Sequence, residues 1–214
     1  MKQDARKERK IIIFDMDGVI FDSSAFTQRT FLALHPGVTE HMYKEISTGN
    51  FHEEAKKYAH LKIEGTEEEK AQRRISYAET KSTMPMFDGM KNVLDELHRR
   101  EYILVLNTSA FERNCLPLLE KSEIKDMFDF IATAELSKSK VEKFKIIEDK
   151  YGANKKDMLF ITDSLGDVRE AEIAEIPTIA VTWGIHDNSY FTREKHPFLI
   201  GVVDSVDALK SLIQ

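Results

Sequence analysis

The chain has 214 residues, with 31 Lys and Arg against 37 Asp and Glu, a formal net charge of −6 and 42% hydrophobic residues. These proportions exclude a wholly disordered or fibrous protein, and the acidic balance argues against a constitutive nucleic-acid binder, so we expect no nucleic-acid partner. The single cysteine, Cys115, allows neither an internal disulfide nor a cysteine-rich zinc site, which favours a reducing, cytoplasmic location.

The beginning of the chain is basic but carries no membrane signal. The apolar run behind it, residues 11–14, is shorter than the roughly 7–15 residues at the centre of a signal peptide. No run elsewhere approaches the ~18 consecutive apolar residues that span a bilayer. We therefore expect residues 1–10 to be a solvated tail and the protein not to bind a membrane.

Short apolar runs rich in branched side chains recur along the chain, each bounded by polar or turn residues, as is typical of buried parallel strands. Helical spacings of apolar residues separate them. This alternation predicts an α/β fold, in which helices cover both faces of a doubly wound, Rossmann-like parallel sheet. The predicted strands are 11–14, 103–106, 158–161 and 178–181, with 128–132 as a further candidate and a closing helix over 205–213 that turns Leu209 and Leu212 inward.

Residues 25–85 break this alternation, because they contain helical cues and no convincing strand. Thr66 and Glu69 have the spacing of a capping box ahead of a helix. Pro85 and the Asp88-Gly89 pair mark the end of the region. We therefore predict two domains: an α/β core formed by 1–24 and 86–214, and a small all-helical cap, 25–85, inserted after the first strand.

An acidic pair follows the first predicted strand. Asp15 and Asp17 are two residues apart, so their side chains point the same way in extended backbone, and Gly18 permits a sharp turn. Ligands of open α/β sheets bind at the carboxyl ends of strands. A helix cap or turn explains one of these aspartates but not the pair. A calcium loop of the EF-hand type fails on spacing, because its glycine follows a third acidic or amide position.

Polar residues also follow the other predicted strands. Thr108 and Ser109 come after one strand, Asp163 and Asp167 after another, and residues 137–140 (SKSK) precede a helix. Adjacent parallel strands would bring these groups to one edge of the sheet. Converging carboxylates repel one another unless a cation lies among them, and oxygen ligands suit Mg²⁺. We therefore expect Mg²⁺ as the cofactor.

The sequence is identified, on its motifs, as a member of the haloacid dehalogenase superfamily. Residues 15–22 (DMDGVIFD) match the first motif, 104–109 (LVLNTS) resemble the second and 163–167 (DSLGD) the fourth. The resemblance is to the phosphatase branch with a helical cap, which includes phosphoglycolate phosphatase and β-phosphoglucomutase. The third motif usually has a lysine followed by proline, whereas this chain has two lysines and no proline. Counting back from Phe144 favours Lys138, and a shorter spacing favours Lys140.

The resemblance implies a Mg²⁺-dependent phosphatase that hydrolyses a small phosphorylated metabolite through an aspartyl-phosphate. Asp15 would be the nucleophile and Asp17 the general acid and base. The implied catalytic residues are Asp15, Asp17, Thr108 and Lys138, and the implied metal ligands are the Asp15 side chain, the Asp17 carbonyl and Asp163, with Asp167 completing or supporting the shell.

Substrate choice is expected to lie in the cap. The loop 47–50 suits a turn that faces a ligand, so we expect Gly49 and Asn50, together with Ser109, to bind substrate; an ordinary turn between helices is the alternative. A sugar phosphomutase shares this core and cap type. A signalling receiver also uses Asp, Thr, Lys and Mg²⁺, but the helical insert and the DMDG sequence count against it. A non-catalytic binding module is a third possibility, and we expect a monomer or a homodimer.

Overall fold

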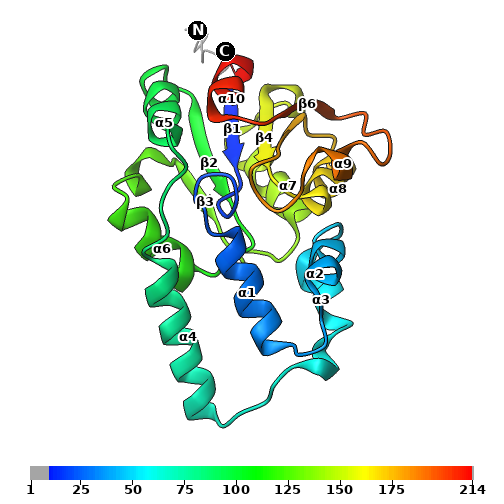
Figure 1. Ribbon diagram of the computed structural model, residues 1–214. Helices are drawn as coiled ribbons and strands as arrows, with labels where there is room; N and C mark the ends of the chain where they lie inside the picture. Colours follow the sequence, from blue (N-terminus) through cyan, green and yellow to red (C-terminus); the bar gives the residue numbers. More distant parts are fainter. Residues whose placement is uncertain (1–9, 214) are drawn as a thin grey trace, which may run out of the picture.

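A parallel sheet of six strands, in the order β3-β2-β1-β4-β5-β6, forms the centre of the computed structural model, which describes residues 10–213 (Figure 1). Residues 1–9, most of the predicted tail, lie outside the described residues. All neighbouring strands pair in parallel. The strands are β1 (Ile11–Phe14), β2 (Ile103–Asn107), β3 (Phe130–Ala132), β4 (Met158–Thr162), β5 (Thr178–Val181) and β6 (Leu199–Val203).

The predicted doubly wound α/β fold is confirmed. From β1 the chain reaches β2 and β3 on one side and then β4, β5 and β6 on the other, so the winding reverses between β1 and β4. Loops diverge at such a reversal and leave a crevice at the carboxyl ends of the strands. All the predicted strands are present, whereas β6 was not predicted. It is an edge strand that carries Gly201 and the exposed Ile200, so it lacks a buried-strand pattern.

Successive side chains of β1 point to opposite faces of the sheet, and helices cover both of these faces. Ile12 and Phe14 pack in a cluster with α5, α6 and α10, whereas Ile11 and Ile13 pack with residues of α7 and α8. The helices of the core are α5 (Met90–Arg99), α6 (Glu112–Lys121), α7 (Lys140–Tyr151), α8 (Leu165–Ile173), α9 (Asn188–Phe191) and α10 (Val206–Ile213), with short 3-10 turns at Lys125–Met127 and Lys155–Asp157.

The closing helix is present as α10, but the prediction that Leu212 points inward is wrong. Leu209 is buried, whereas the side chain of Leu212 is 46% exposed. Ile213 is buried with Leu209 instead, because residues four apart lie on one face of a helix.

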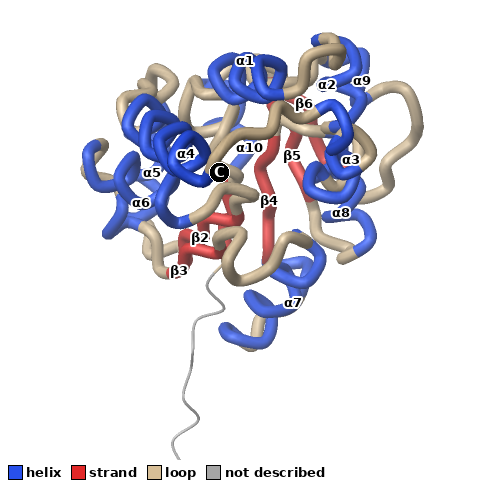
Figure 2. Tube along the Cα trace, turned by 90° about the horizontal axis from the view of Figure 1, so that it is seen from below, coloured by secondary structure: helices blue, strands red, loops and turns tan. Residues whose placement is uncertain are grey.

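Residues 24–81, which follow β1, are helical, as predicted, and they lie at the carboxyl ends of the strands (Figures 1 and 2). The rings of Phe26 in α1 and Tyr77 in α4 stack with centroids 5.2 Å apart, which joins these two helices. The division into domains at residues 24 and 85 stays a prediction. The helices of this segment are α1 (Ser24–Leu34), α2 (Glu40–Ile46), α3 (Phe51–Lys56) and α4 (Glu67–Lys81), with a 3-10 turn at Ala59–Leu61.

The predicted capping box begins α4. The Thr66 hydroxyl accepts a hydrogen bond from the Glu69 N–H at 3.2 Å, and the Glu69 carboxylate accepts one from the Thr66 N–H at 2.9 Å. Thr66→Ala is therefore expected to lower the free energy of unfolding by about 1 kcal/mol, measured by urea denaturation. Thr80→Ala, the same substitution in the last turn of α4, is the control, and an equal loss in both variants would contradict the stabilising role of the capping box.

None of the helices within residues 10–213 is both long and apolar enough to cross a membrane.

Candidate active site

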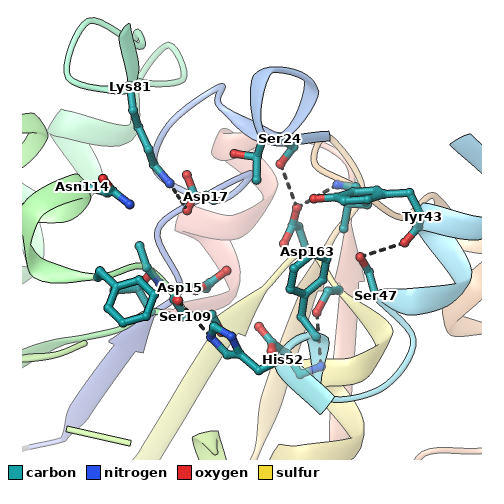
Figure 3. Close-up of a pocket in the computed structure, with 18 of the residues that line it drawn as sticks. Asp15, Asp17, Ser24, Tyr43, Ser47, His52, Lys81, Ser109, Asn114 and Asp163 are labelled. Carbon is teal, nitrogen blue, oxygen red and sulfur yellow. Dashed lines mark hydrogen bonds and ion pairs between the residues drawn. The ribbon is translucent and has the colours of Figure 1, made fainter. Parts of the chain in front are cut away.

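A cavity of about 370 Å³ lies between the carboxyl ends of the central strands and the helices above them (Figure 3). The loops after the strands and the helices of residues 24–81 both contribute to its walls. The lining residues are Asp15, Asp17, Ser24, Thr27, Tyr43, Ser47, Gly49, Phe51, His52, Tyr77, Lys81, Thr108, Ser109, Ala110, Phe111, Arg113, Asn114, Asp163, Ser164, Asp167 and Ile185.

The loops after β1 and β4 meet at this cavity. The Asp15 N–H donates to the Ile161 carbonyl at 2.9 Å, so strand pairing extends one residue beyond β1. The chain then turns at Gly18, whose φ of +74° is favourable for glycine. A Cβ at Gly18 would overlap the Asp163 carboxylate, so the two loops pack without room for a side chain there. The turn thereby brings Asp163 next to the acidic pair of the first motif.

Lys140 is the lysine that the structure places among the carboxylates. Its Nζ lies 2.8 Å from Asp15 Oδ1 and 2.6 Å from Asp167 Oδ2, and the residue is 1% exposed. Lys138, which the spacing from Phe144 favoured, is exposed.

Lys140 reaches the carboxylates, and Lys138 does not, because of the residue at which α7 begins. The Ser139 hydroxyl caps the helix by accepting a hydrogen bond from the Glu142 N–H, so Lys140 is the first helical residue. From that position its side chain donates to the Asn107 carbonyl at 3.0 Å, at the carboxyl end of β2. Residues 137–141 contain no proline to start the helix elsewhere, and Lys140, as the first residue of α7, is the lysine whose side chain reaches the carboxylates.

Burial makes negative charge unfavourable at the centre of the site. It raises the pKa of Asp15 to about 6, although the Lys140 ammonium opposes the increase. It also raises the pKa of Asp163 well above its usual value, and the nearby Asp15 carboxylate adds to that effect. Burial alone would lower the pKa of Lys140, but Asp15 and Asp167 more than compensate, so Lys140 stays charged.

The donor set fits a hard cation such as Mg²⁺. Within residues 10–213 no three His, Cys, Asp or Glu side chains form a metal-holding group by themselves. Asp15 and Asp163, however, are two buried carboxylates whose pKa values are raised chiefly by burial, and neighbouring carboxylates add to the increase, so a cation between them would stabilise their charged forms. Mg²⁺ usually takes one or two carboxylates and keeps several waters. Asp167 is engaged by Lys140 and by the Thr162 hydroxyl at 2.7 Å, which suits a supporting position.

Asp17 is held by two residues that the sequence analysis did not identify. The Ser23 hydroxyl donates to Asp17 Oδ1 at 2.5 Å, and Lys81 Nζ lies 2.7 Å from Asp17 Oδ2. Lys81 is the last residue of α4 and is 2% exposed. Figure 3 shows its side chain reaching toward Asp17. Burial lowers the pKa of Lys81, but the Asp17 carboxylate and Tyr77 together outweigh burial, so the pKa is raised.

The loop after β2 supplies Thr108 and Ser109 to the cavity wall, as the sequence predicts. The Thr108 carbonyl accepts a hydrogen bond from Lys143 Nζ at 2.7 Å. Burial, with a smaller contribution from the Lys140 charge, lowers the pKa of Lys143 to about 8. The sequence analysis missed Lys143, although its spacing of three residues from Lys140 places both on one face of α7.

The loop 47–50 lies against the core. Gly49 lines the cavity, and its carbonyl occupies the space that a Cβ at Gly166 would need. Asn50 does not line the cavity: its Nδ2 donates to the Lys138 carbonyl at 2.9 Å and to Glu170 Oε1 at 3.1 Å. Asn50 therefore joins the helical segment to α8 and to the loop before α7, and its expected contact with substrate stays a prediction.

The fold and the site together define a class of protein. It is an enzyme-like α/β protein, whose winding reverses at β1 and whose buried carboxylates and lysine form a polar site at the carboxyl edge of the sheet, next to α1–α4. The family model described as haloacid dehalogenase-like hydrolase matches residues 12–181, and the chain belongs to this family. The resemblance drawn from the motifs is confirmed, and so is the prediction of an enzyme of the hydrolase class.

Individual proteins of known sequence or structure resemble the chain over part or most of its length. The Pyrophosphatase PpaX of Oceanobacillus iheyensis is 25% identical over 88% of this chain and 90% of its own. A phosphoglycolate phosphatase of Aliivibrio fischeri is 28% identical over 46% of this chain and 45% of its own. The crystal structure of a haloacid dehalogenase-like hydrolase from Bacteroides fragilis superposes with a TM-score of 0.73 at 18% identity, covering 94% of this chain and 99% of that one.

Proposed function

We propose that the protein is a Mg²⁺-dependent phosphatase that hydrolyses a small phosphorylated metabolite through an aspartyl-phosphate on Asp15. The observation that carries this proposal is the Asp15 carboxylate, which lines the cavity and pairs with the buried Lys140 ammonium at 2.8 Å. The names of the two relatives, a pyrophosphatase and a phosphoglycolate phosphatase, support phosphate chemistry.

The proposed reaction has two displacements at phosphorus. An Asp15 oxygen attacks, the bond from phosphorus to the ester oxygen breaks, and Asp17 gives a proton to the leaving oxygen. Asp17 then takes a proton from a water molecule that attacks the aspartyl-phosphate, releasing inorganic phosphate and restoring Asp15. Acid and base help of this kind contributes about 10²–10⁴-fold.

The other groups of the site stabilise the phosphoryl oxygens. Lys140 supplies a fixed positive charge and Thr108 a hydroxyl, and preorganised groups of this kind are usually the largest contribution to catalysis. Mg²⁺, held by Asp15, the Asp17 carbonyl and Asp163, would offset the repulsion between a carboxylate and a phosphate dianion. In this proposal Lys140 replaces Lys138 as the third-motif lysine, and Asp167 supports both Lys140 and the metal site.

The cavity favours a small substrate, because its volume of about 370 Å³ lies near the lower end for ligand pockets. Helices α1–α4 would act as the cap that excludes water from it, with residues 25–85 as the cap domain. Gly49 and Ser109 line the cavity and are proposed to contact the substrate. A sugar phosphomutase is the alternative, since it would use the same core residues. A cytoplasmic monomer or homodimer without a nucleic-acid or membrane partner stays our prediction.

A panel of phosphorylated metabolites tests the function. With Mg²⁺ we expect inorganic phosphate to be released from at least one of phosphoglycolate, pyrophosphate or the sugar phosphates. Removing divalent ions with EDTA should reduce the rate at least about 10³-fold, and added Mg²⁺ should restore it. An isomerised product without phosphate release would indicate the phosphomutase. A turnover rate that EDTA does not change would contradict the proposed requirement for Mg²⁺.

A further inference from the structure

Glu170 of α8 is a buried carboxylate that the reaction just proposed does not use. It is 9% exposed. Burial raises the pKa of Glu170, and the nearby Asp167 carboxylate adds to the increase. A buried carboxylate is costly unless its surroundings replace the water that it loses. In this protein the replacement comes mainly from the start of α7.

Three hydrogen-bond donors meet at one oxygen of Glu170. The Lys140 N–H donates to Glu170 Oε1 at 2.9 Å, the Ser139 hydroxyl at 3.2 Å and the Asn50 amide at 3.1 Å. The first N–H groups of a helix have no partner within the helix, and negative charge is stabilised near them. Lys140 is 1% exposed, so its N–H requires a partner from the protein, and Glu170 provides it.

These contacts fix the residue at which α7 begins. The Ser139 hydroxyl accepts from the Glu142 N–H at 3.4 Å and donates to Glu170, so the carboxylate orients the group that caps the helix. Lys140 then occupies the first helical position, where proline is common because its ring sets the helical backbone angle. Lysine has no such ring. Glu170 supplies the missing constraint by binding the backbone of Lys140.

The start of α7 decides which side chain reaches the acidic groups of the site. Lys140 Nζ lies 2.8 Å from Asp15 Oδ1 and 2.6 Å from Asp167 Oδ2. Successive residues of a helix point about 100° apart around its axis. If α7 began one residue earlier or later, the Lys140 ammonium would be turned away from the carboxylates.

We propose that Glu170 is a positioning residue for Lys140, which it holds by the backbone N–H so that the ammonium group lies at Asp15. This inference rests on the proposed function, in which Lys140 stabilises the phosphoryl oxygens. Glu170 does not line the cavity, so it acts through Lys140 and not on the substrate. Its loss should therefore affect the chemical step more than substrate binding.

A double-mutant cycle between Glu170 and Lys140 tests the inference, with phosphate release from p-nitrophenyl phosphate in the presence of Mg²⁺ as the assay. Glu170→Met fills the same space without an acceptor and is expected to lower kcat at least about 10-fold, as displacement of a catalytic group does, with a much smaller change in KM. In the Lys140→Met background it should cause no further loss, because the group to be positioned is absent. Glu170→Gln keeps an oxygen that can accept the same hydrogen bonds, so it should retain most of kcat.

Glu172→Met is the matched control, since it makes the same substitution in α8 at a residue that pairs with His196; its kcat should equal that of the wild type. If Glu170→Met or Lys140→Met does not fold, Glu170→Ala or Lys140→Gln takes its place in the cycle.

Several results would each overturn the inference while leaving the phosphatase in place. They are an unchanged kcat in Glu170→Met, equal losses in both Lys140 backgrounds, an equal loss in Glu172→Met, or a kcat in Glu170→Gln as low as in Glu170→Met. A rise in KM with unchanged kcat would do the same. A wild-type protein that releases phosphate from no ester in the metabolite panel or this assay overturns the proposed function, and the inference with it.

Discussion

Asp15→Asn is expected to reduce phosphate release by about 10⁴-fold or more, because the covalent route loses its nucleophile. The amide has nearly the same shape as the carboxylate, so the loop after β1 should keep its pairing with Ile161. An amide oxygen, however, neither attacks phosphorus effectively nor pairs with the Lys140 ammonium. The measurement is kcat in the presence of Mg²⁺ with the best substrate from the metabolite panel.

Asp22→Asn is the matched control for this substitution. Asp22 belongs to the same first motif but is exposed, so its loss of charge should leave kcat close to that of the wild type. Circular dichroism of both variants would show whether the fold is intact. Near-normal turnover by a folded Asp15→Asn protein would refute the assignment of Asp15 as the nucleophile.

Lys140→Met is expected to lower kcat by about 10²–10³-fold, the usual effect of removing one preorganised donor to a reacting oxyanion. It also leaves the buried carboxylates of Asp15 and Asp167 without their ammonium, which would lower the free energy of unfolding by about 3–5 kcal/mol. Kinetic assays and urea denaturation measure the two effects separately. Lys140→Arg, which keeps the charge, should retain most of the stability.

Lys138→Met is the comparison that decides between the two lysines of the third motif. Its side chain is exposed, so the substitution should change neither kcat nor stability appreciably. A large loss of activity in Lys138→Met together with normal activity in Lys140→Met would show that the spacing from Phe144, and not the start of α7, identifies the catalytic lysine.

The sequence predicts the frame of this fold well because local patterns determine it. The branched apolar run of β1 and the capping box of α4 both follow from neighbouring residues, and both are present. Edge strand β6 escaped prediction because Gly201 and the exposed Ile200 remove the buried pattern on which strand assignment depends.

The supporting residues of the site could not be predicted because their contacts are remote in sequence. Lys81 and Asp17 are 64 positions apart, and nothing in the charged sequence of α4 distinguishes its last lysine from Lys70, the other lysine of that helix. The choice of Lys140 depends on where a helix begins, which the sequence indicates to within a few residues. Asn50 was predicted from turn chemistry alone, which cannot tell whether a loop faces a ligand or a neighbouring helix.

Direct detection of a phosphorylated Asp15 is the closest test of the account. Asp17→Asn should slow hydrolysis of the intermediate, so acid-quenched protein taken during turnover of p-nitrophenyl phosphate with Mg²⁺ is expected to carry the added mass of one phosphoryl group on the peptide containing Asp15. The Asp15→Asn protein should carry none. Steady phosphate release from wild type, with no phosphoryl group on that peptide in Asp17→Asn, or with the group on another residue, would contradict the proposed mechanism.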